Sequence, residues 1–334
     1  MNKDRIASLV WAGALVVVAC IIPLRAGAQA IGRRVPNVRD GKIRMSFAAR
    51  PNICGFDNGI STNAHQRGND RSNWSSEKSE DVEYDNQCSE GPVRVVAAFQ
   101  NGALSKIRTY VGGRWRPSSG VTDIGTVSTR DATEYLIGLA RTQPGKAAGE
   151  AVYPITLADS IEPAQPIYSI ARDNSRPMDV RGPAIFWLSQ VDDDRAVGML
   201  NEILKSASNS EIQDKAIFGL SQQRSGKGLA ILRDFAEKEG APDEVRGKAI
   251  FWLGQSKDDG GQYLRSLYPR VHSSELKDKI IFSMSQQKGA ASVDWLMIVA
   301  KNDPDRDARK KAMFWLGQSH DQRVSAFLSD MINR

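Results

Sequence analysis

The side chains that most often carry catalysis or bind metals are scarce in this chain. Its 334 residues include three cysteines and three histidines, His65, His272 and His320. The sequence has no His-Glu-x-x-His zinc motif, no Gly-x-Ser-x-Gly nucleophile motif and no glycine-rich phosphate loop ahead of a helical segment. We therefore expect no catalytic residue, no metal ligand and no cofactor, and we interpret the protein as non-enzymatic.

The first thirty residues have the pattern of a secretory signal peptide. A positively charged start precedes an apolar run over residues 6–24, and small residues follow that run. The pattern predicts cleavage after Ala28 or Ala30 and a periplasmic or secreted mature protein. Two alternatives stay open, because the apolar run could remain as an uncleaved membrane anchor, or Cys20 could carry a lipid. Either alternative would attach the protein to a membrane.

Removal of the signal would leave two cysteines, Cys54 and Cys88, which flank the polar stretch of residues 61–87. In an oxidising compartment such a pair is best explained as one structural disulfide, and its spacing differs from the Cys-x-x-Cys of redox proteins. Closure of a loop of about 35 residues would contribute roughly 3–4 kcal/mol in the chain-entropy model. We predict a Cys54–Cys88 disulfide that closes a surface loop.

Residues 31–127 predict a small β-rich head. Two β-prone runs, at 93–99 and 104–111, flank the dipeptide Asn101-Gly102. An Asn-Gly pair between two such runs is typical of a tight hairpin, because both turn residues must adopt positive φ. The head therefore contains at least one antiparallel strand pair in addition to its polar loop.

One heptapeptide recurs five times in the C-terminal half. Its copies start at residues 184, 216, 249, 280 and 312, so that the period is 31–33 residues. A period near 32 is the signature of an array of stacked structural units. Each unit predicts two helices, of which the first is apolar on nearly every side. Such a helix must be covered by neighbours on several sides, which stacked repeats provide.

These repeats resemble a known family. The segment Asp243-Glu244-Val245-Arg246-x-x-Ala249-x-x-x-Leu253-Gly254 resembles the HEAT repeat, in the variant often called PBS-lyase HEAT-like. The resemblance covers about residues 145–334. It implies a mainly α fold, with an α-solenoid of paired antiparallel helices over residues 128–334 and clear repeats from about 178. HEAT arrays are generally scaffolds that bind other proteins, so the resemblance also implies a protein partner.

The fourth position of the heptapeptide alternates between large and small residues. The order is Trp187, Gly219, Trp252, Ser283 and Trp315, which makes the structural unit a pair of repeats with a period near 64 residues. Two interpretations are open. Each Trp could fill the space left by a small neighbour, or the three Trp residues could lie along one exposed face as anchors for a partner.

A glutamine ends every copy of the heptapeptide. Each amide could satisfy free carbonyl groups at the end of the first helix, or the amides could form a polar ladder along one edge of a groove. Together with the three Trp residues, these glutamines are our candidate partner-binding residues: Gln190, Gln222, Gln255, Gln286 and Gln318.

Charges over residues 178–334 are interspersed and nearly balanced, so no basic stripe for nucleic acid is present. We expect a secreted or periplasmic scaffold that binds a protein partner on the face of its helical array. One alternative is an accessory or lyase-like enzyme component with a site in the head, where Glu80, Asp81 and Glu83 could line a pocket beside a basic residue. Another alternative is a structural protein of the cell envelope.

Overall fold

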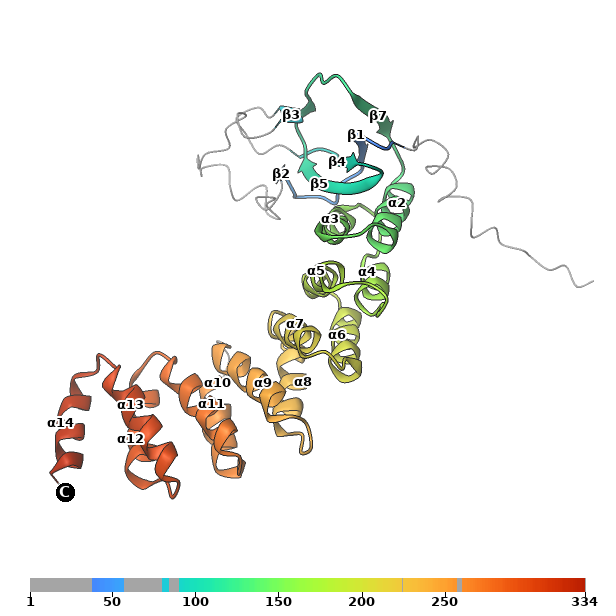
Figure 1. The fold of residues 1–334 in the computed structure, drawn as a ribbon. Coiled ribbons are helices and arrows are strands. Elements are labelled where there is room, and N and C mark those ends of the chain that lie inside the picture. Colours follow the sequence, from blue (N-terminus) through green and yellow to red (C-terminus); the bar gives the residue numbers. More distant parts are fainter. Residues whose placement is uncertain (1–37, 57–79, 84–89, 224, 257–259, 334) are drawn as a thin grey trace, which may run out of the picture.

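A computed structural model describes residues 38–56, 80–83, 90–223, 225–256 and 260–333. Within these ranges the protein is mainly helical, with thirteen α-helices and a small N-terminal sheet (Figure 1). None of these helices is both long enough and apolar enough to cross a membrane. The predicted signal peptide with Cys20, most of the polar stretch at 61–87, and Cys88 lie outside the described residues.

The N-terminal part forms a five-stranded sheet with the strand order β2-β5-β4-β1-β7. Its central hairpin pairs β4 (Val93–Gln100) with β5 (Ala103–Val111). Asn101 and Gly102 at the turn have φ values of 52° and 81°, so the predicted Asn-Gly hairpin is confirmed. The other strands are β1 (Gly41–Phe47), which is antiparallel to β4, β7 (Val121–Thr126), which is parallel to β1, and the short β2 (Gly55–Phe56).

The helices that follow lie in two rows (Figure 1). Consecutive helices of the first row pack against one another, and each helix from α5 on also packs against the second-row helix that follows it. The first row contains α3 (Lys146–Glu150), α5 (Met178–Ser189), α7 (Ser210–Ser221), α9 (Asp243–Gln255), α11 (Ser274–Ser285) and α13 (Arg306–Gly317). The second row contains α2 (Thr129–Thr142), α4 (Ala164–Ala171), α6 (Asp194–Ser206), α8 (Lys227–Glu237), α10 (Gly260–Leu267), α12 (Ala290–Asn302) and α14 (Gln322–Ile332).

Many helix starts are encoded locally by capping residues. In six helices a Ser, Asp or Asn side chain accepts a hydrogen bond from a backbone N–H group of the first turn, which would otherwise lack a partner. These capping residues are Ser128, Asp193, Asn209, Ser273, Asp305 and Asp321. The boundaries of the helical pairs therefore follow from short sequence signals rather than from packing alone.

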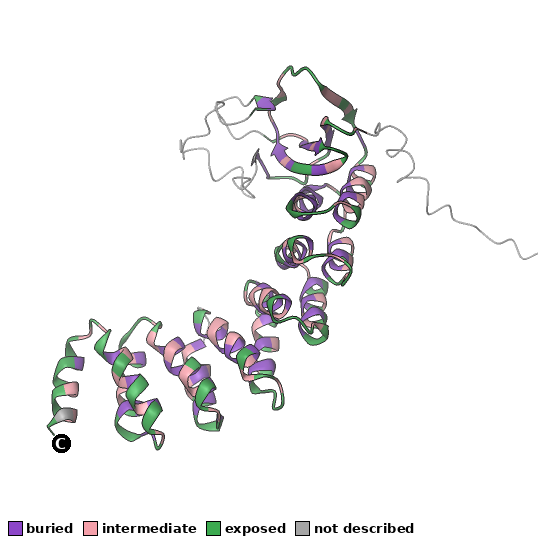
Figure 2. Cartoon of the chain, viewed as in Figure 1, coloured by how far each residue is buried: buried purple, intermediate pink, exposed green. Residues whose placement is uncertain are grey.

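One continuous apolar core joins the sheet to the helices. Phe47 of β1 and Val93 of β4 are fully buried in the same cluster as Leu136 of α2 and Ile155 of the 3-10 helix η4 (Tyr153–Leu157). Buried positions lie where the elements face one another, and exposed positions lie on the outer sides of the array (Figure 2). The head therefore closes the N-terminal end of the helical array and shares its core.

A second pair of strands covers part of the other face of the sheet. β3 (Val82–Glu83) pairs with β6 (Arg114–Trp115), and Val82 packs in a small separate cluster with Val96 and Tyr110. Cys54 is fully buried beside β2 and is disulfide-bonded. Its pairing with Cys88 stays a prediction, because Cys88 lies outside the described residues.

Candidate functional site

The first-row helices leave one apolar face open. In α5 the side chains of Ala184, Ile185 and Leu188 are fully buried, whereas Phe186 is 41% exposed. Stacking thus covers this helix on several sides, as expected, but it leaves open the face that carries the third residue of the heptapeptide. Neighbouring first-row helices and the second row cover three sides, and nothing in the described chain forms a third layer over the fourth side.

The third residue of the heptapeptide is a phenylalanine in every copy. Those at the two ends are exposed, Phe314 by 56%, and the three between them are half-buried. Phe251 and Phe282 stack with their ring centroids 6.1 Å apart, so that aromatic surface passes from one repeat to the next. We call this set the Phe row, which consists of Phe186, Phe218, Phe251, Phe282 and Phe314.

Each Trp of the heptapeptide contacts an aromatic ring of the preceding unit. Trp187 stacks on Tyr153 at a centroid distance of 4.1 Å, and Trp315 lies 5.1 Å from Phe282. Trp252 makes the equivalent contact with Phe218, at 4.9 Å. All three Trp residues are half-buried. Each of them therefore has both a packing contact and exposed surface, so the packing role and the exposed position are not exclusive.

The small fourth-position residues allow two pairs of helices to approach closely. A Cβ atom on Gly219 would lie 3.0 Å from Cβ of Ser189, so α7 lies directly against α5. The equivalent Ser283 of α11 is fully buried, and its Cβ would lie 2.8 Å from a Cβ on Gly254 of α9. Gly219 and Ser283 therefore face small residues rather than a Trp, and the large residues fill the other interfaces, α7–α9 and α11–α13.

A second glutamine ties each close pair of helices together. Nε2 of Gln223 donates a hydrogen bond of 2.6 Å to the carbonyl oxygen of Ser189, and Nε2 of Gln287 donates to the carbonyl oxygen of Gly254. These carbonyls lie at the ends of α5 and α9, where no intrahelical donor remains. The free helix carbonyl is therefore satisfied by the side-chain amide of Gln223 or Gln287, the residue that directly follows the candidate Gln222 or Gln286. The doubled glutamine in alternate copies is the sequence signal for this contact.

The five candidate glutamines are all exposed at the ends of the first-row helices. In three of them Nε2 donates to the hydroxyl of the preceding serine, as in Gln190, where the distance to Ser189 Oγ is 3.0 Å. Each serine hydroxyl in turn donates to a backbone carbonyl of its own helix. This chain of hydrogen bonds orients the amides on an open surface. We call the row the Gln edge: Gln190, Gln222, Gln255, Gln286 and Gln318.

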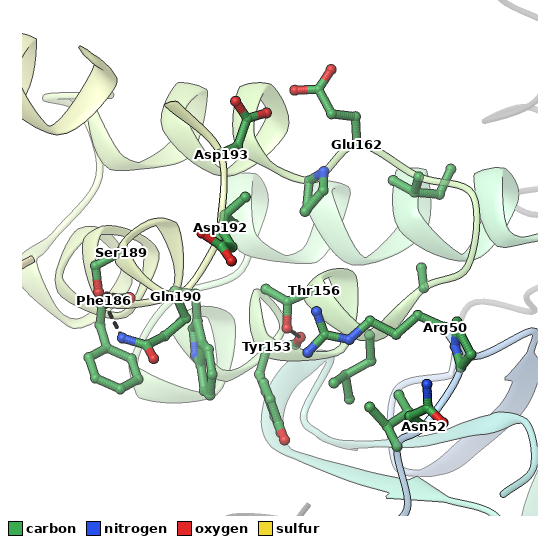
Figure 3. A pocket seen from close by; sticks show the side chains of 18 of the residues that line it. Arg50, Asn52, Tyr153, Thr156, Glu162, Phe186, Ser189, Gln190, Asp192 and Asp193 are labelled. Carbon is green, nitrogen blue, oxygen red and sulfur yellow. Dashed lines mark hydrogen bonds between the residues drawn. The ribbon is translucent and has the colours of Figure 1, made fainter. Parts of the chain in front are cut away.

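The Gln edge borders a cavity of about 1150 Å³ where the head meets the first repeats (Figure 3). The stacked rings of Tyr153 and Trp187 form an aromatic wall of this cavity, which Gln190 also lines. Residues 50–53 of the head line the opposite side, and their only charged side chain is Arg50. The remaining charged groups that line this cavity are carboxylates, from Glu162, Asp192 and Asp193.

A second cavity occupies the equivalent position between α11 and α13. It has a volume of about 460 Å³ and is lined by Trp315, by Gln286 and Gln318 of the Gln edge, and by Asp321. Asp321 is the only charged residue in its lining. Trp187 and Trp315 occupy the same position of the heptapeptide, and each lines a cavity at the Gln edge. We call these two cavities the Trp pockets.

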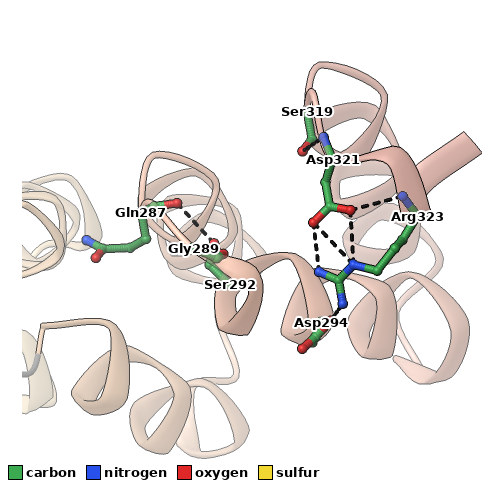
Figure 4. A network of polar contacts seen from close by, with 7 residues as sticks. All are labelled: Gln287, Gly289, Ser292, Asp294, Ser319, Asp321 and Arg323. Atoms are coloured by element: carbon green, nitrogen blue, oxygen red, sulfur yellow. Dashed lines mark hydrogen bonds and ion pairs between the residues drawn. The ribbon is translucent and has the colours of Figure 1, made fainter.

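An ion-pair network holds the acidic rim of the second Trp pocket (Figure 4). Arg323 lies 2.7 Å from a carboxylate oxygen of Asp321 and 2.6 Å from one of Asp294. Hydrogen bonds from Arg323 lower the pKa of Asp321 to about 2. In the first Trp pocket, hydrogen bonds from Arg195 likewise lower the pKa of Asp193. Both carboxylates therefore stay ionised at physiological pH, and each is paired with an arginine.

We expect α14 to loosen in acid because of Asp321. Its pKa in the folded chain lies below the ordinary Asp value, so the stabilisation from its charge is present above about pH 4 and is lost as the pH falls toward 2. Hydrogen exchange of α14 at pH 5 and pH 2.5 should show this loss. The variant Asp321→Ser keeps a capping hydroxyl without the charge, and its α14 should respond less to pH. An equal response in both proteins would contradict the assignment.

The carboxylates of the head form a structural cluster. Asp81 is buried, accepts a hydrogen bond of 3.0 Å from the hydroxyl of Tyr110, and lies 3.0 Å from Nζ of Lys42. Glu80 pairs with Arg108 at 3.0 Å, and Glu83 lies in β3 on the exposed side. None of these three carboxylates lines either of the two cavities at the Gln edge. In the part of the chain that the structure covers, no group of three or more His, Cys, Asp or Glu residues could hold a metal ion.

Comparisons with known proteins add little. No family model matches the chain, and no curated protein matches it. A structure of human deoxyhypusine hydroxylase in complex with glycerol is similar over 60% of this chain and 91% of that chain, with 14% identity and a TM-score of 0.27. A chain from a computational design of self-assembling cyclic homooligomers covers 61% and 88%, with 12% identity and a TM-score of 0.18. Similarities of this size carry no argument about fold or function.

Proposed function

We propose that this protein is a secreted or periplasmic scaffold of the HEAT type, an α-solenoid that binds a protein partner along the Phe row and the Gln edge. The observation that carries the proposal is the exposure of Phe186 and Phe314. Both lie on the open face of helices whose other faces are buried. The export of the protein follows from the signal-peptide pattern of residues 1–30, and the HEAT type follows from the repeat motif.

An exposed aromatic row is costly in a protein that has no partner, because large apolar side chains gain free energy when they leave water. Ring contacts through Trp252 and Trp315 join four of the five phenylalanines, from Phe218 to Phe314, into one aromatic surface rather than scattered residues. The oriented amides of the Gln edge add hydrogen-bonding groups beside that patch. An apolar centre with a polar border is the usual composition of a protein interface. This surface favours a specific partner over a purely structural role in the envelope.

The proposal is tested with a double variant of the Phe row, Phe186→Ser with Phe314→Ser. The mature wild-type protein and the variant would each be crosslinked to envelope extract, and a protein captured by the wild type would be purified and titrated. Loss of two aromatic contacts should weaken its binding at least ten-fold, because aromatic anchors dominate interface energies. Circular dichroism would confirm that the variant keeps its helix content.

The matched control is Ile298→Ser. Ile298 lies on α12 in the second row, is 58% exposed and belongs to neither the Phe row nor the Gln edge. We expect this variant to bind the captured protein as tightly as the wild type does. Equal binding by the Phe-row variant, or a loss confined to Ile298→Ser, would overturn the proposed binding face.

A further inference from the structure

Each close pair of first-row helices begins with a helix that carries Trp at the fourth position of the heptapeptide. α5 with Trp187 packs closely against α7, and α9 with Trp252 packs closely against α11. α13 carries the third of these residues, Trp315, and is the last first-row helix that the structure describes. The side of α13 that corresponds to the close interface is therefore uncovered within the described chain.

Three residues on this side are less covered than their counterparts in the preceding repeats. Met313 is half-buried, whereas the isoleucine at the same position of each earlier heptapeptide is fully buried. Leu328 of α14 is half-buried, whereas the matching leucine of each of the four preceding second-row helices is at most 2% exposed. A Cβ atom on Gly317 would have no heavy atom within 4 Å, whereas one on Gly254 would touch Ser283. The buried counterparts are Ile185, Ile217, Ile250, Ile281, Leu200, Leu232, Leu264 and Leu296.

We call Lys310, Met313, Gly317 and Leu328 the outer face. The last three lose burial for one reason, because α13 and α14 lack the following first-row helix that covers their counterparts. The outer face nevertheless keeps a Met, a Gly and a Leu, as the interfaces inside the array keep apolar and small residues. Burial of apolar side chains is favourable, so a helix that fits this face gains free energy there.

The close pair α5–α7 shows what kind of helix fits such a face. Three residues of α7 that are spaced four apart, and so lie on one side of the helix, contact α5. Lys215 lies over Gly182, with its Cε 2.9 Å from the position of a Cβ atom there. Gly219 lies against the side chain of Ser189, and Gln223 donates to the carbonyl oxygen of that serine.

α11 repeats this arrangement against α9. Lys279 lies over Gly247, and both Ser283 and Gln287 contact Gly254. The complementary surface of a close pair is therefore a helix face with a Lys, then a Gly or Ser four residues later, then a Gln after four more. The counterpart of Gly254 on α13 is Gly317, and no later first-row helix of the described chain offers a glutamine to its carbonyl oxygen.

Lys310 changes the first of these three requirements. It occupies the position of Gly182 and Gly247, so a Lys on an incoming helix would meet a second Lys side chain instead of open space. Lys310 pairs with Asp307 of its own helix at 3.2 Å, but both side chains are more than half exposed. An exposed pair of this kind contributes little, so Lys310 remains available to a second carboxylate. An incoming helix should therefore carry Asp or Glu where α7 and α11 carry Lys, which argues against a second copy of either helix as the occupant.

We propose that the outer face binds one helix of a partner protein, which carries Asp or Glu, then Gly or Ser four residues later, then Gln after four more. The carboxylate pairs with Lys310, the small residue lies against Gly317, and the glutamine amide donates to the carbonyl oxygen of Gly317. Apolar residues that flank these three cover Met313 and Leu328. The site uses no residue of the Phe row or the Gln edge, so it goes beyond the proposed function and does not depend on it.

The probe is a fluorescent peptide with the sequence of residues 273–290 and the substitution Lys279→Glu. A further substitution, Ser274→Lys, allows a lactam with Asp278 on the side opposite Ser283, because short helices need such support in water. Anisotropy would measure its binding to the full mature chain up to about 1 mM. We expect detectable binding, and circular dichroism would verify that every peptide used has the same helix content.

Three control peptides each change one requirement of the probe. Restoration of Lys279 should weaken binding at least five-fold, because two ammonium groups then meet. Gln287→Ala should weaken binding about five-fold, because it removes the donor for the carbonyl oxygen of Gly317. Ser283→Trp should weaken binding at least ten-fold, because the indole prevents the close approach of the two helices.

Two receptor variants test the site on the chain itself. Gly317→Leu fills the space that the small residue of the probe requires, and it should weaken binding at least ten-fold. The matched control is Gly138→Leu in α2, which should bind the probe as the wild type does. A Cβ atom at either glycine would have no heavy atom within 4 Å, so neither substitution disturbs the fold.

Charge reversal tests the acidic requirement. Lys310→Glu should reverse the preference of the receptor, so that the peptide with Lys279 binds more tightly than the probe with Glu at that position. A preference that Lys310→Glu leaves unchanged would overturn the role of Lys310 and with it the proposed chemistry of the partner helix.

Other outcomes also overturn the proposal. They are no binding of the probe, equal binding of the Ser283→Trp peptide, and equal effects of Gly317→Leu and Gly138→Leu. A dimer of the chain in sedimentation that Gly317→Leu abolishes would show that a second copy covers the outer face, and the partner helix would then be wrong. Phe186→Ser should bind the probe normally, and a loss in that variant would place the peptide on the Phe row instead.

Discussion

Replacement of Gly228 by Ala is expected to destabilise the protein by about 2–3 kcal/mol, although the same change in an open helix is stabilising. Gly228 lies in the first turn of α8, where a Cβ atom would lie 2.0 Å from the carbonyl oxygen of Leu220 in α7. Backbone cannot move aside as a flexible side chain can, so α8 must shift away from α7. Urea denaturation followed by circular dichroism, with hydrogen exchange of α7 and α8, would measure the effect.

The control for this prediction is Gly198→Ala in α6. A Cβ atom on Gly198 would have no heavy atom within 4 Å, so nothing opposes the gain in helix propensity. We expect this variant to be more stable than the wild type by about 0.5–1 kcal/mol. Changes in stability of opposite sign for Gly228→Ala and Gly198→Ala would show that the backbones of α7 and α8 are in contact. Stabilisation by both substitutions would show that these two backbones are not in contact.

Replacement of Gln223 by Ala is expected to cost about 1–3 kcal/mol, because it removes the donor that reaches the carbonyl oxygen of Ser189 across the close pair α5–α7. Gln223 is 8% exposed, so water does not readily replace the lost amide. The interface that loosens should be the one between α5 and α7. Denaturation with urea and hydrogen exchange of both helices would measure the loss.

The adjacent Gln222 provides the comparison. It is exposed on the Gln edge, and its Nε2 bonds only the hydroxyl of Ser221 among the contacts that we find. Gln222→Ala should change stability by no more than about 0.5 kcal/mol, but it should weaken the binding of a partner. The two neighbours are thus expected to have opposite roles, one in stability and one in recognition. Equal effects of both substitutions on stability would argue against this division.

Several features of the fold followed from short sequence signals. The hairpin at Asn101-Gly102 depends on two residues that tolerate positive φ, and the helix starts depend on capping side chains such as Asp193 and Asp321. The period near 32 residues placed the helical pairs, because a repeated apolar pattern demands a repeated packing solution. The turn and capping signals act within one hairpin or one helical turn, and the period can be counted along the chain, so all of them are visible without knowledge of which elements pack together.

Features of the candidate site depended on contacts that a sequence does not show. The apolar pattern alone did not distinguish the burial of Phe186 from that of Ile185, but the array has only two layers, and Phe186 faces the side that no layer covers. Gln222 and Gln223 have the same side chain. Gln223 donates to a carbonyl of the preceding repeat, whereas Gln222 faces solvent. The direction of each side chain was set by the position of its residue on the helix.

The sequence by itself determined the repeat, the helical pairs, the hairpin and the set of candidate residues. Only the tertiary structure decided that the head shares a core with the array, that the Trp residues pack and remain partly exposed, and that cavities form beside two of them. The physical reason is that periodicity and turn chemistry are local properties of the chain. Exposure and cavities depend instead on which elements, distant in sequence, cover each face after folding.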